Sequence, residues 1–269
     1  MKKVRLDQRV FELGFTESRE RAKTTVMSGI VFVNGQRADK PGMPVDPDAD
    51  IEVRGVALPF VSRGGFKLDK ALKVFPIDPA GKTCIDCGAS TGGFTDVLLQ
   101  HGAAKVYAVD VGYGQLAWKL RNDERVINLE RTNLRYVTEE QIPELLDIAV
   151  MDVSFISVKL VLPAVQRLLK PDADIVCLIK PQFEAGREKV GKRGVVRDAC
   201  VHEEVIETVL KGAREYGYAA QHLSFSPIKG PNGNIEYLAH YLFGAEEQEM
   251  PTKAVVQSAH ALLSSRVQP

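Results

Sequence analysis

The chain has 269 residues, of which 45% are hydrophobic and 26% charged, so it has enough apolar material for one large globular domain or two unequal ones. This composition excludes a disordered or a collagen-like chain. Because 35 basic side chains balance 35 acidic ones, any affinity for nucleic acid must come from local basic patches.

The sequence shows no sign of export or of membrane insertion. Asp7, Arg9 and Glu12 interrupt the apolar stretch that a signal peptide requires. A membrane span needs about 20 predominantly apolar residues, and no such run is present. The cysteines are too sparse for the disulfide framework of a small secreted protein. We therefore expect a cytoplasmic protein with reduced cysteines.

Residues 1–60 are predicted to form a small α+β domain that ends in a short linker, 54–60. Thr16 and the acidic residues after it mark the start of a second helix. An apolar run at 30–33 leads into Asn34-Gly35, a strong hairpin signal, and 51–53 is a further strand. Two helices are predicted from apolar residues at helical spacing: Leu6, Val10 and Leu13, then Ala22, Val26 and Met27.

This order of elements resembles the S4 RNA-binding domain of ribosomal proteins. The resemblance covers about the first 60 residues and implies that basic side chains on the helices bind structured RNA. A merely solvated basic face is the alternative for any charged run. The residues implied in RNA contact are Arg5, Arg19, Arg21 and Lys23.

Residues 61–245 are predicted to form a Rossmann-like α/β domain. Apolar strands at 83–87, 106–111, 148–153 and 175–179 alternate with helices around 92–101, 115–121, 157–169 and 202–216, which indicates a parallel, doubly wound sheet. Two final strands, 219–228 and 235–243, are joined by a turn too short for a helical crossover, so they should pair antiparallel. In the tail, 246–269, we expect a short helix over 252–265.

A run of small residues follows the first strand of this domain and is predicted to hold a cofactor. Ligands of doubly wound sheets bind at the carboxyl ends of the strands. Asp110 ends the second strand, about 20 residues further on, where an acidic side chain can bind ribose hydroxyls. The spacing of the glycines favours S-adenosylmethionine over a dinucleotide. The candidate residues of the loop are Asp86, Gly88, Ser90, Thr91, Gly92 and Gly93.

Four polar residues should converge on the same edge of the sheet. Asp152 and Lys180 each end a strand, and Glu236 begins the last strand, which runs the opposite way. Lys67 lies at the start of the helix that leads into the sheet. Each residue alone could be a cap or a surface group, but together they indicate a catalytic site.

The Cys-x-x-Cys spacing of Cys84 and Cys87 could suggest redox or zinc chemistry. Both residues lie on a predicted strand, and no second pair or histidine pattern completes a metal site. Core packing is the simpler interpretation, and no metal is expected.

The four converging residues resemble the Lys-Asp-Lys-Glu tetrad of the FtsJ-like ribose 2′-O-methyltransferases. With the S4-like domain and the segments 61–68, 131–133, 151–155 and 179–184, the whole chain resembles the TlyA family, also called hemolysin A. The resemblance implies 2′-O-methylation of cytidines in ribosomal RNA, without a metal or an obligate protein partner. It also implies that Asn133 lies near the adenine. Lys180 is the candidate base, which Asp152 and Glu236 would help to orient.

A basic loop at 186–197 follows the strand predicted at 175–179 and should lie near the RNA. Its glycines predict mobility, so we expect the loop to order when substrate binds. The candidate RNA contacts are Arg187, Lys189, Lys192 and Arg193.

Several alternatives remain open at this point. A noncatalytic ribosome-assembly factor would have the same RNA-binding domain. A membrane-lytic hemolysin would need a span or a cationic amphipathic helix, and a pseudouridine synthase would need a different catalytic domain. The sequence leaves open the modified nucleotide, the choice between one and both ribosomal subunits, the oligomeric state, the role of the linker, and whether Lys180 removes the proton or only orients the hydroxyl.

Overall fold

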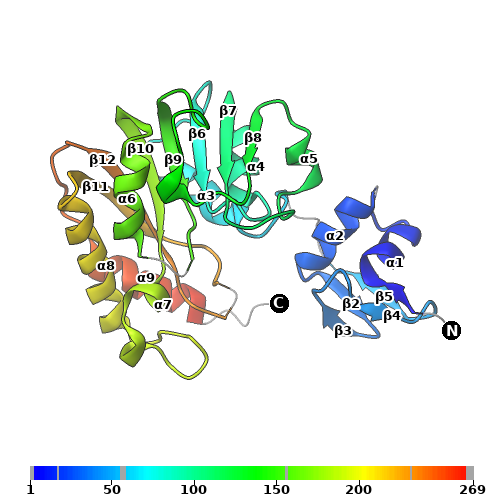
Figure 1. Cartoon of the computed structure of the whole chain (residues 1–269). Coiled ribbons are helices and arrows are strands. Elements are labelled where there is room, and N and C mark those ends of the chain that lie inside the picture. Colours follow the sequence, from blue (N-terminus) through cyan, green and yellow to red (C-terminus); the bar gives the residue numbers. More distant parts are fainter. Residues whose placement is uncertain (1–2, 17, 55–58, 155–156, 231, 265–269) are drawn as a thin grey trace. The chain divides into compact units, whose positions relative to one another are not determined.

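The computed structural model describes residues 3–16, 18–54, 59–154, 157–230 and 232–264. The chain forms two compact units, Met1–Arg63 and Gly64–Pro269, which we describe separately (Figure 1). Most of the linker predicted at 54–60 lies outside the described residues.

In the part of the first unit that the structure describes, there are two helices and five short strands. Its strands form a three-stranded antiparallel sheet, β3-β2-β5, and a separate pair, β1-β4. Asn34 and Gly35 join β2 to β3 with φ angles of 50° and 76°, as the predicted hairpin requires. The elements are β1 (Val4–Arg5), α1 (Leu6–Glu12), α2 (Arg19–Met27), β2 (Val31–Val33), β3 (Gln36–Ala38), β4 (Pro44–Val45) and β5 (Ile51–Val53).

The prediction that Thr16 starts the second helix was wrong by two residues. Ser18 is the N-cap of α2, because its hydroxyl accepts a hydrogen bond from the Arg21 amide at 3.1 Å. The Thr16 hydroxyl instead donates to the Ser18 carbonyl. The apolar faces of both helices are buried against the sheet, with Leu6, Val10, Ala22 and Val26 in the core.

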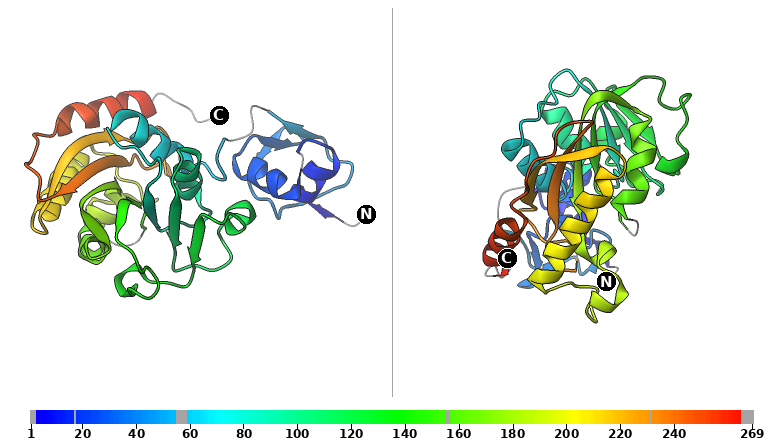
Figure 2. Two further views of the ribbon diagram at one scale, coloured as in Figure 1. Left: turned by 90° about the horizontal axis from the view of Figure 1, so that it is seen from above. Right: turned by 90° about the vertical axis from the view of Figure 1, so that its left-hand side faces the viewer.

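The second unit is built on a seven-stranded sheet with helices on both faces. Helices α6 and α8 cover one face, and α3 and α4 cover the other (Figures 1 and 2). The elements are α3 (Gly65–Val74), β6 (Thr83–Cys87), α4 (Gly93–Gln100), β7 (Lys105–Val109), α5 (Trp118–Arg121), β8 (Val126–Leu129), η1 (Leu134–Tyr136), β9 (Leu146–Met151), α6 (Val158–Gln166), β10 (Leu169–Ile179), α7 (Pro181–Glu184), η2 (Arg187–Lys189), α8 (Ala199–Arg214), β11 (Tyr218–Phe225), β12 (Tyr237–Phe243) and α9 (Thr252–Ser264).

The strand order β11-β12-β10-β9-β6-β7-β8 confirms the predicted doubly wound fold. The strands β6 to β10 run parallel, and β12 is antiparallel to both of its neighbours, as expected. The carboxyl ends of the parallel strands and the beginning of β12 therefore meet at one edge of the sheet.

Some predicted boundaries differ from the structure for local reasons. The strand predicted at 106–111 ends at Val109, because Asp110 turns away to accept backbone hydrogen bonds. The helix predicted at 115–121 begins only at Trp118, since Gln115 contacts the glycine loop. The strand β8 was not predicted, and α9 packs against α8 and β11.

Candidate active site

Lys67, Asp152, Lys180 and Glu236 form one cluster of charged side chains, which we call the tetrad. The Lys67 Nζ atom lies 3.1 Å from Asp152 Oδ2 and 2.7 Å from Glu236 Oε2. The Lys180 Nζ atom lies 2.5 Å from Asp152 Oδ1 and 2.8 Å from the Ser154 hydroxyl. The two lysines and the two acidic residues therefore form a continuous chain of contacts.

Each tetrad residue is placed by the end of a secondary-structure element. Asp152 follows β9, and its amide donates to the Cys87 carbonyl of β6. Lys180 follows β10 and is the N-cap of α7, while Glu236 directly precedes β12. Lys67 lies in the first turn of α3 and reaches the same edge of the sheet.

Burial and pairing have opposite effects on the pKa values of Lys67 and Asp152. Burial alone would lower the pKa of Lys67, but the carboxylates of Asp152 and Glu236 outweigh it, so this pKa is raised. Burial would raise the pKa of Asp152, but the two lysines lower it below its ordinary value. Lys67 is therefore held as an ammonium group and Asp152 as a carboxylate.

A cavity of about 510 Å³ opens beside the tetrad. Of the predicted cofactor residues, Gly88, Ser90, Asp110 and Asn133 line it, and Asp152 connects it to the tetrad. Gly88 has a φ of +86°, and a Cβ there would lie only 3.1 Å from the Asp152 carbonyl oxygen. Glycine thus lets this loop turn sharply and approach the segment that carries Asp152.

Asp110 lies in the wall of this cavity and holds neighbouring backbone in place through hydrogen bonds. Its carboxylate accepts hydrogen bonds from the Ser90 amide at 2.8 Å and from the Gly112 amide at 2.6 Å. The Ser90 hydroxyl donates to Gln115 at 3.2 Å. The glycine loop and the end of β7 are therefore linked, and both present polar atoms to the cavity.

Four predicted cofactor residues do not line this cavity among the described residues. Gly92 is the N-cap of α4, Gly93 begins that helix, and Thr91 precedes them in the loop. Asp86 is buried within β6, where its Oδ2 atom accepts from the Thr95 amide at 2.9 Å and hydroxyl at 2.7 Å. Direct contact between these four residues and a cofactor stays a prediction.

The cavity is also lined by residues that were not predicted as site residues, although some lie in the segments 131–133 and 151–155. Ser154 lies two positions after Asp152, and its hydroxyl joins the lining to Lys180. The nearest sequence signal was its place just past a strand end. The other residues of this kind are Val109, Val111, Gln115, Thr132, Leu134, Arg135, Val153 and Val161.

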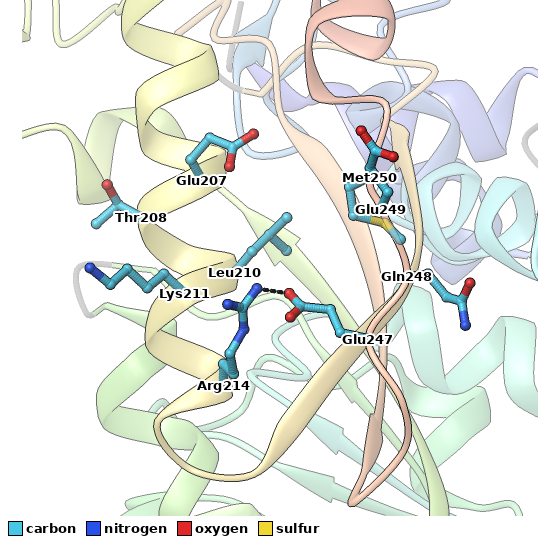
Figure 3. Close-up of a pocket in the computed structure, with 9 residues that line it drawn as sticks. All are labelled: Glu207, Thr208, Leu210, Lys211, Arg214, Glu247, Gln248, Glu249 and Met250. Carbon is cyan, nitrogen blue, oxygen red and sulfur yellow. Dashed lines mark hydrogen bonds and ion pairs between the residues drawn. The ribbon is translucent and has the colours of Figure 1, made fainter.

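A second cavity, of about 640 Å³, lies between α8 and the segment before α9 (Figure 3). It contains side chains of both charges, and Arg214 forms an ion pair with Glu247 across it. None of its described lining residues belongs to the tetrad or to the glycine loop. The cavity beside the tetrad is therefore the candidate active site.

The predicted RNA-binding residues lie on two exposed surfaces. Arg19, Arg21 and Lys23 lie on α2, and Arg5 forms a two-pronged pair with Asp7. In the loop 186–197, all four predicted basic residues are exposed, and Lys189 pairs with Glu204 at 2.5 Å. The first group lies in the first unit and the second in the unit with the tetrad.

The fold and the site together define a Rossmann-type methyltransferase, with a reversed last strand and a glycine loop beside a Lys-Asp-Lys-Glu cluster. Residues 60–243 match the FtsJ-like methyltransferase model, and residues 4–51 match the S4 domain. The chain belongs to the FtsJ-like methyltransferase family and, by its full-length relatives, to the TlyA group.

Two relatives and one solved structure illustrate this similarity. The chain is 51% identical to YqxC of Bacillus subtilis, over 98% of this chain and 97% of that protein. It is 44% identical to the 16S/23S rRNA (cytidine-2′-O)-methyltransferase TlyA of Mycobacterium tuberculosis, over 98% of each chain. A solved structure from Streptococcus thermophilus is 47% identical, with a TM-score of 0.78 over 98% of each chain.

Proposed function

We propose that the protein transfers a methyl group from S-adenosylmethionine to the ribose 2′-hydroxyl of cytidines in ribosomal RNA. The observation that carries this proposal is the tetrad of two lysines and two acidic residues, three of them buried, beside a cavity lined by the glycine loop and Asp110. The full-length relative from Mycobacterium tuberculosis supports the choice of substrate through its name.

The cavity fits S-adenosylmethionine in its chemistry. Gly88 lets the loop turn beside the segment of Asp152 in the wall of the cavity, and Asp110 can accept hydrogen bonds from ribose hydroxyls. Apolar side chains such as Val111 and Leu134 can contact the adenine, and Asn133 offers it polar atoms. When bound, S-adenosylmethionine would supply an electrophilic methyl group: as an oxygen bonds to the methyl carbon, the carbon–sulfur bond breaks and the sulfonium leaves as a neutral thioether.

The two lysines have different roles in this proposal. Lys67 contacts two carboxylates and has a raised pKa, so it stays protonated and holds Asp152 and Glu236 in place. Lys180 contacts one carboxylate and the Ser154 hydroxyl at the cavity wall. Lys180 is therefore the group that meets the ribose. In its neutral form, its Nζ accepts the 2′-hydroxyl proton as the new oxygen–carbon bond forms.

Holding the hydroxyl in line is a large part of the proposed catalysis. Well-oriented groups can replace about 7–11 kcal/mol of barrier, so a fixed tetrad accelerates the reaction even before proton transfer is considered. The exposed basic residues of α2 and of the loop 186–197 would bind phosphates and bring the ribose to this point.

Transfer of radiolabelled methyl to isolated ribosomal subunits and their free RNAs tests the proposal. Label in a ribose should be lost with Lys180→Ala. Lys170→Ala is the matched control, because Lys170 pairs with Asp147 at the other end of the same two strands, at 2.7 Å. Equal labelling by Lys180→Ala would refute its role. Tight RNA binding without any label would favour the noncatalytic assembly factor.

A direct action on membranes has no support from the structure. Among the described residues, none of the helices has the length and apolar character needed to cross a bilayer.

A further inference from the structure

His202 lies at the centre of a buried polar cluster outside the tetrad. The side chain is fully buried in α8. Its Nε2 atom lies 3.1 Å from the Val196 carbonyl oxygen, at the end of the loop 186–197. Its Nδ1 atom lies 2.7 Å from the Tyr237 hydroxyl and 3.1 Å from Nε2 of His260, on α9. One side chain therefore connects four segments that are distant in sequence.

The contacts fix which nitrogen of His202 carries the proton. A backbone carbonyl can only accept, so the Nε2 of His202 must be the donor to Val196. Burial lowers the pKa of His202 to about 4, so the ring is neutral at physiological pH and Nδ1 has a free lone pair. The Tyr237 hydroxyl and His260 Nε2 are placed to donate to that lone pair. All polar atoms of the ring are thereby used.

Tyr237 connects this cluster to the tetrad through its neighbour in sequence. Adjacent residues of an extended chain point to opposite faces. Accordingly, Glu236 pairs with Lys67 of α3 at 2.7 Å, whereas Tyr237 contacts His202 of α8 on the other face. The beginning of β12 is thus held from both sides of the sheet.

The end of the loop 186–197 is held by hydrogen bonds to Asn234 and His202. The Val196 amide donates to Asn234 Oδ1 at 3.0 Å, while the Val196 carbonyl accepts from His202. The Asn234 amide group donates to the Gly194 carbonyl at 2.8 Å. The last residues of the basic loop are therefore hydrogen-bonded to Asn234, three residues before Tyr237.

We propose that His202 is a positioning residue for the methyl transfer proposed above. It fixes the end of the basic loop relative to Glu236. The ribose of an RNA that the loop binds is thereby placed at the tetrad. His260 extends the same role to α9, because its Nε2 atom is placed to donate to the acceptor nitrogen of His202. The proposal rests on the proposed function, but the geometry that it assigns to the loop can be tested without any activity.

Hydrogen exchange of the loop 186–197 in the free protein is the first test. His202→Phe removes the hydrogen bond to the Val196 carbonyl together with the two contacts of Nδ1, and we expect exchange in the loop about fivefold faster, the effect of about one net hydrogen bond. Tyr241→Phe is the matched control: Tyr241 lies on β12, the strand of Tyr237, is fully buried, and has no hydrogen-bond partner among the described residues. Equal exchange in both variants would overturn the proposal.

Steady-state kinetics with ribosomal RNA is the second test. In His202→Phe and Tyr237→Phe, kcat should fall at least fivefold while KM changes less than twofold, since the basic side chains still bind RNA. His202→Gln should recover most of kcat, because its amide can donate to Val196. A loss of kcat no greater than in Tyr241→Phe would refute the role. If the unaltered protein transfers no methyl, the proposed function fails, and the exchange result alone decides whether His202 holds the loop.

Discussion

Asp86 should make the protein less stable as the pH rises. Its side chain is buried in the central strand β6, and one of its carboxylate oxygens has no partner among the described residues. Burial, with the nearby charges of Asp152 and Asp110, outweighs the hydrogen bonds from Thr95 and raises its pKa from 3.8 to about 7. Between these values the folded protein binds more protons than the unfolded chain, so the free energy of unfolding falls with increasing pH.

The size of this effect follows from the rise in the pKa of Asp86 from 3.8 to about 7. At about 1.4 kcal/mol per unit, ionised Asp86 costs about 4 kcal/mol well above pH 7. Asp86→Asn cannot ionise, although its amide brings a constant cost of its own. The variant should therefore gain up to about 4 kcal/mol relative to the unaltered protein between pH 4 and pH 9.

Urea unfolding followed by circular dichroism at several pH values measures this difference. Asp172→Asn, which removes an exposed carboxylate from β10, controls for the loss of one negative charge. If the stability of Asp86→Asn and of the unaltered protein ran parallel with pH, Asp86 would not be the group responsible, and the reasoning from burial would be refuted.

Three further predictions concern other parts of the chain. In Gly230→Ala, the new Cβ would lie 2.5 Å from Glu236 Oε1, so methyl transfer should fall about tenfold, and an unchanged initial rate would contradict this. Ser18→Ala removes the N-cap of α2 at a cost of about 1 kcal/mol, so hydrogen exchange in α2 should be about fivefold faster than in the unaltered protein. Because burial lowers the pKa of His202 from 6.5 to about 4, stability should fall by up to about 3 kcal/mol as the pH drops between these values; His202→Gln should lose this dependence in urea unfolding.

The sequence predicted the fold well because its signals are local. Alternating apolar runs and turn residues define β6, β9, β10 and the hairpin at Asn34-Gly35, and the reversed last strand follows from one short turn. The strand β8 was missed because it is a four-residue strand at the edge of the sheet. The start of α2 was misplaced because two residues close in sequence, Thr16 and Ser18, both carry a hydroxyl that could cap a helix.

The site was less predictable, because its contacts join residues far apart in the chain. Strand ends indicated the edge on which Asp152, Lys180 and Glu236 lie, but no pattern gives the Ser154 contact of Lys180. Asp86 belongs to the predicted glycine motif yet is buried inside the strand. The cluster around His202 has no sequence signature, since its members are spaced by whole elements.

The place of β12 in the sheet has a consequence for protein synthesis. It is the last strand in the chain, yet it lies between β10 and β11, and it is preceded by Glu236. A growing chain on the ribosome therefore contains both lysines and Asp152 before the fourth charge has been made. Until β12 inserts, Lys67 lacks one of its two carboxylates and the basic loop lacks its attachment to Asn234. Unfinished molecules can thus present basic side chains to RNA without a complete tetrad, so the tetrad is complete only once β12 is in place.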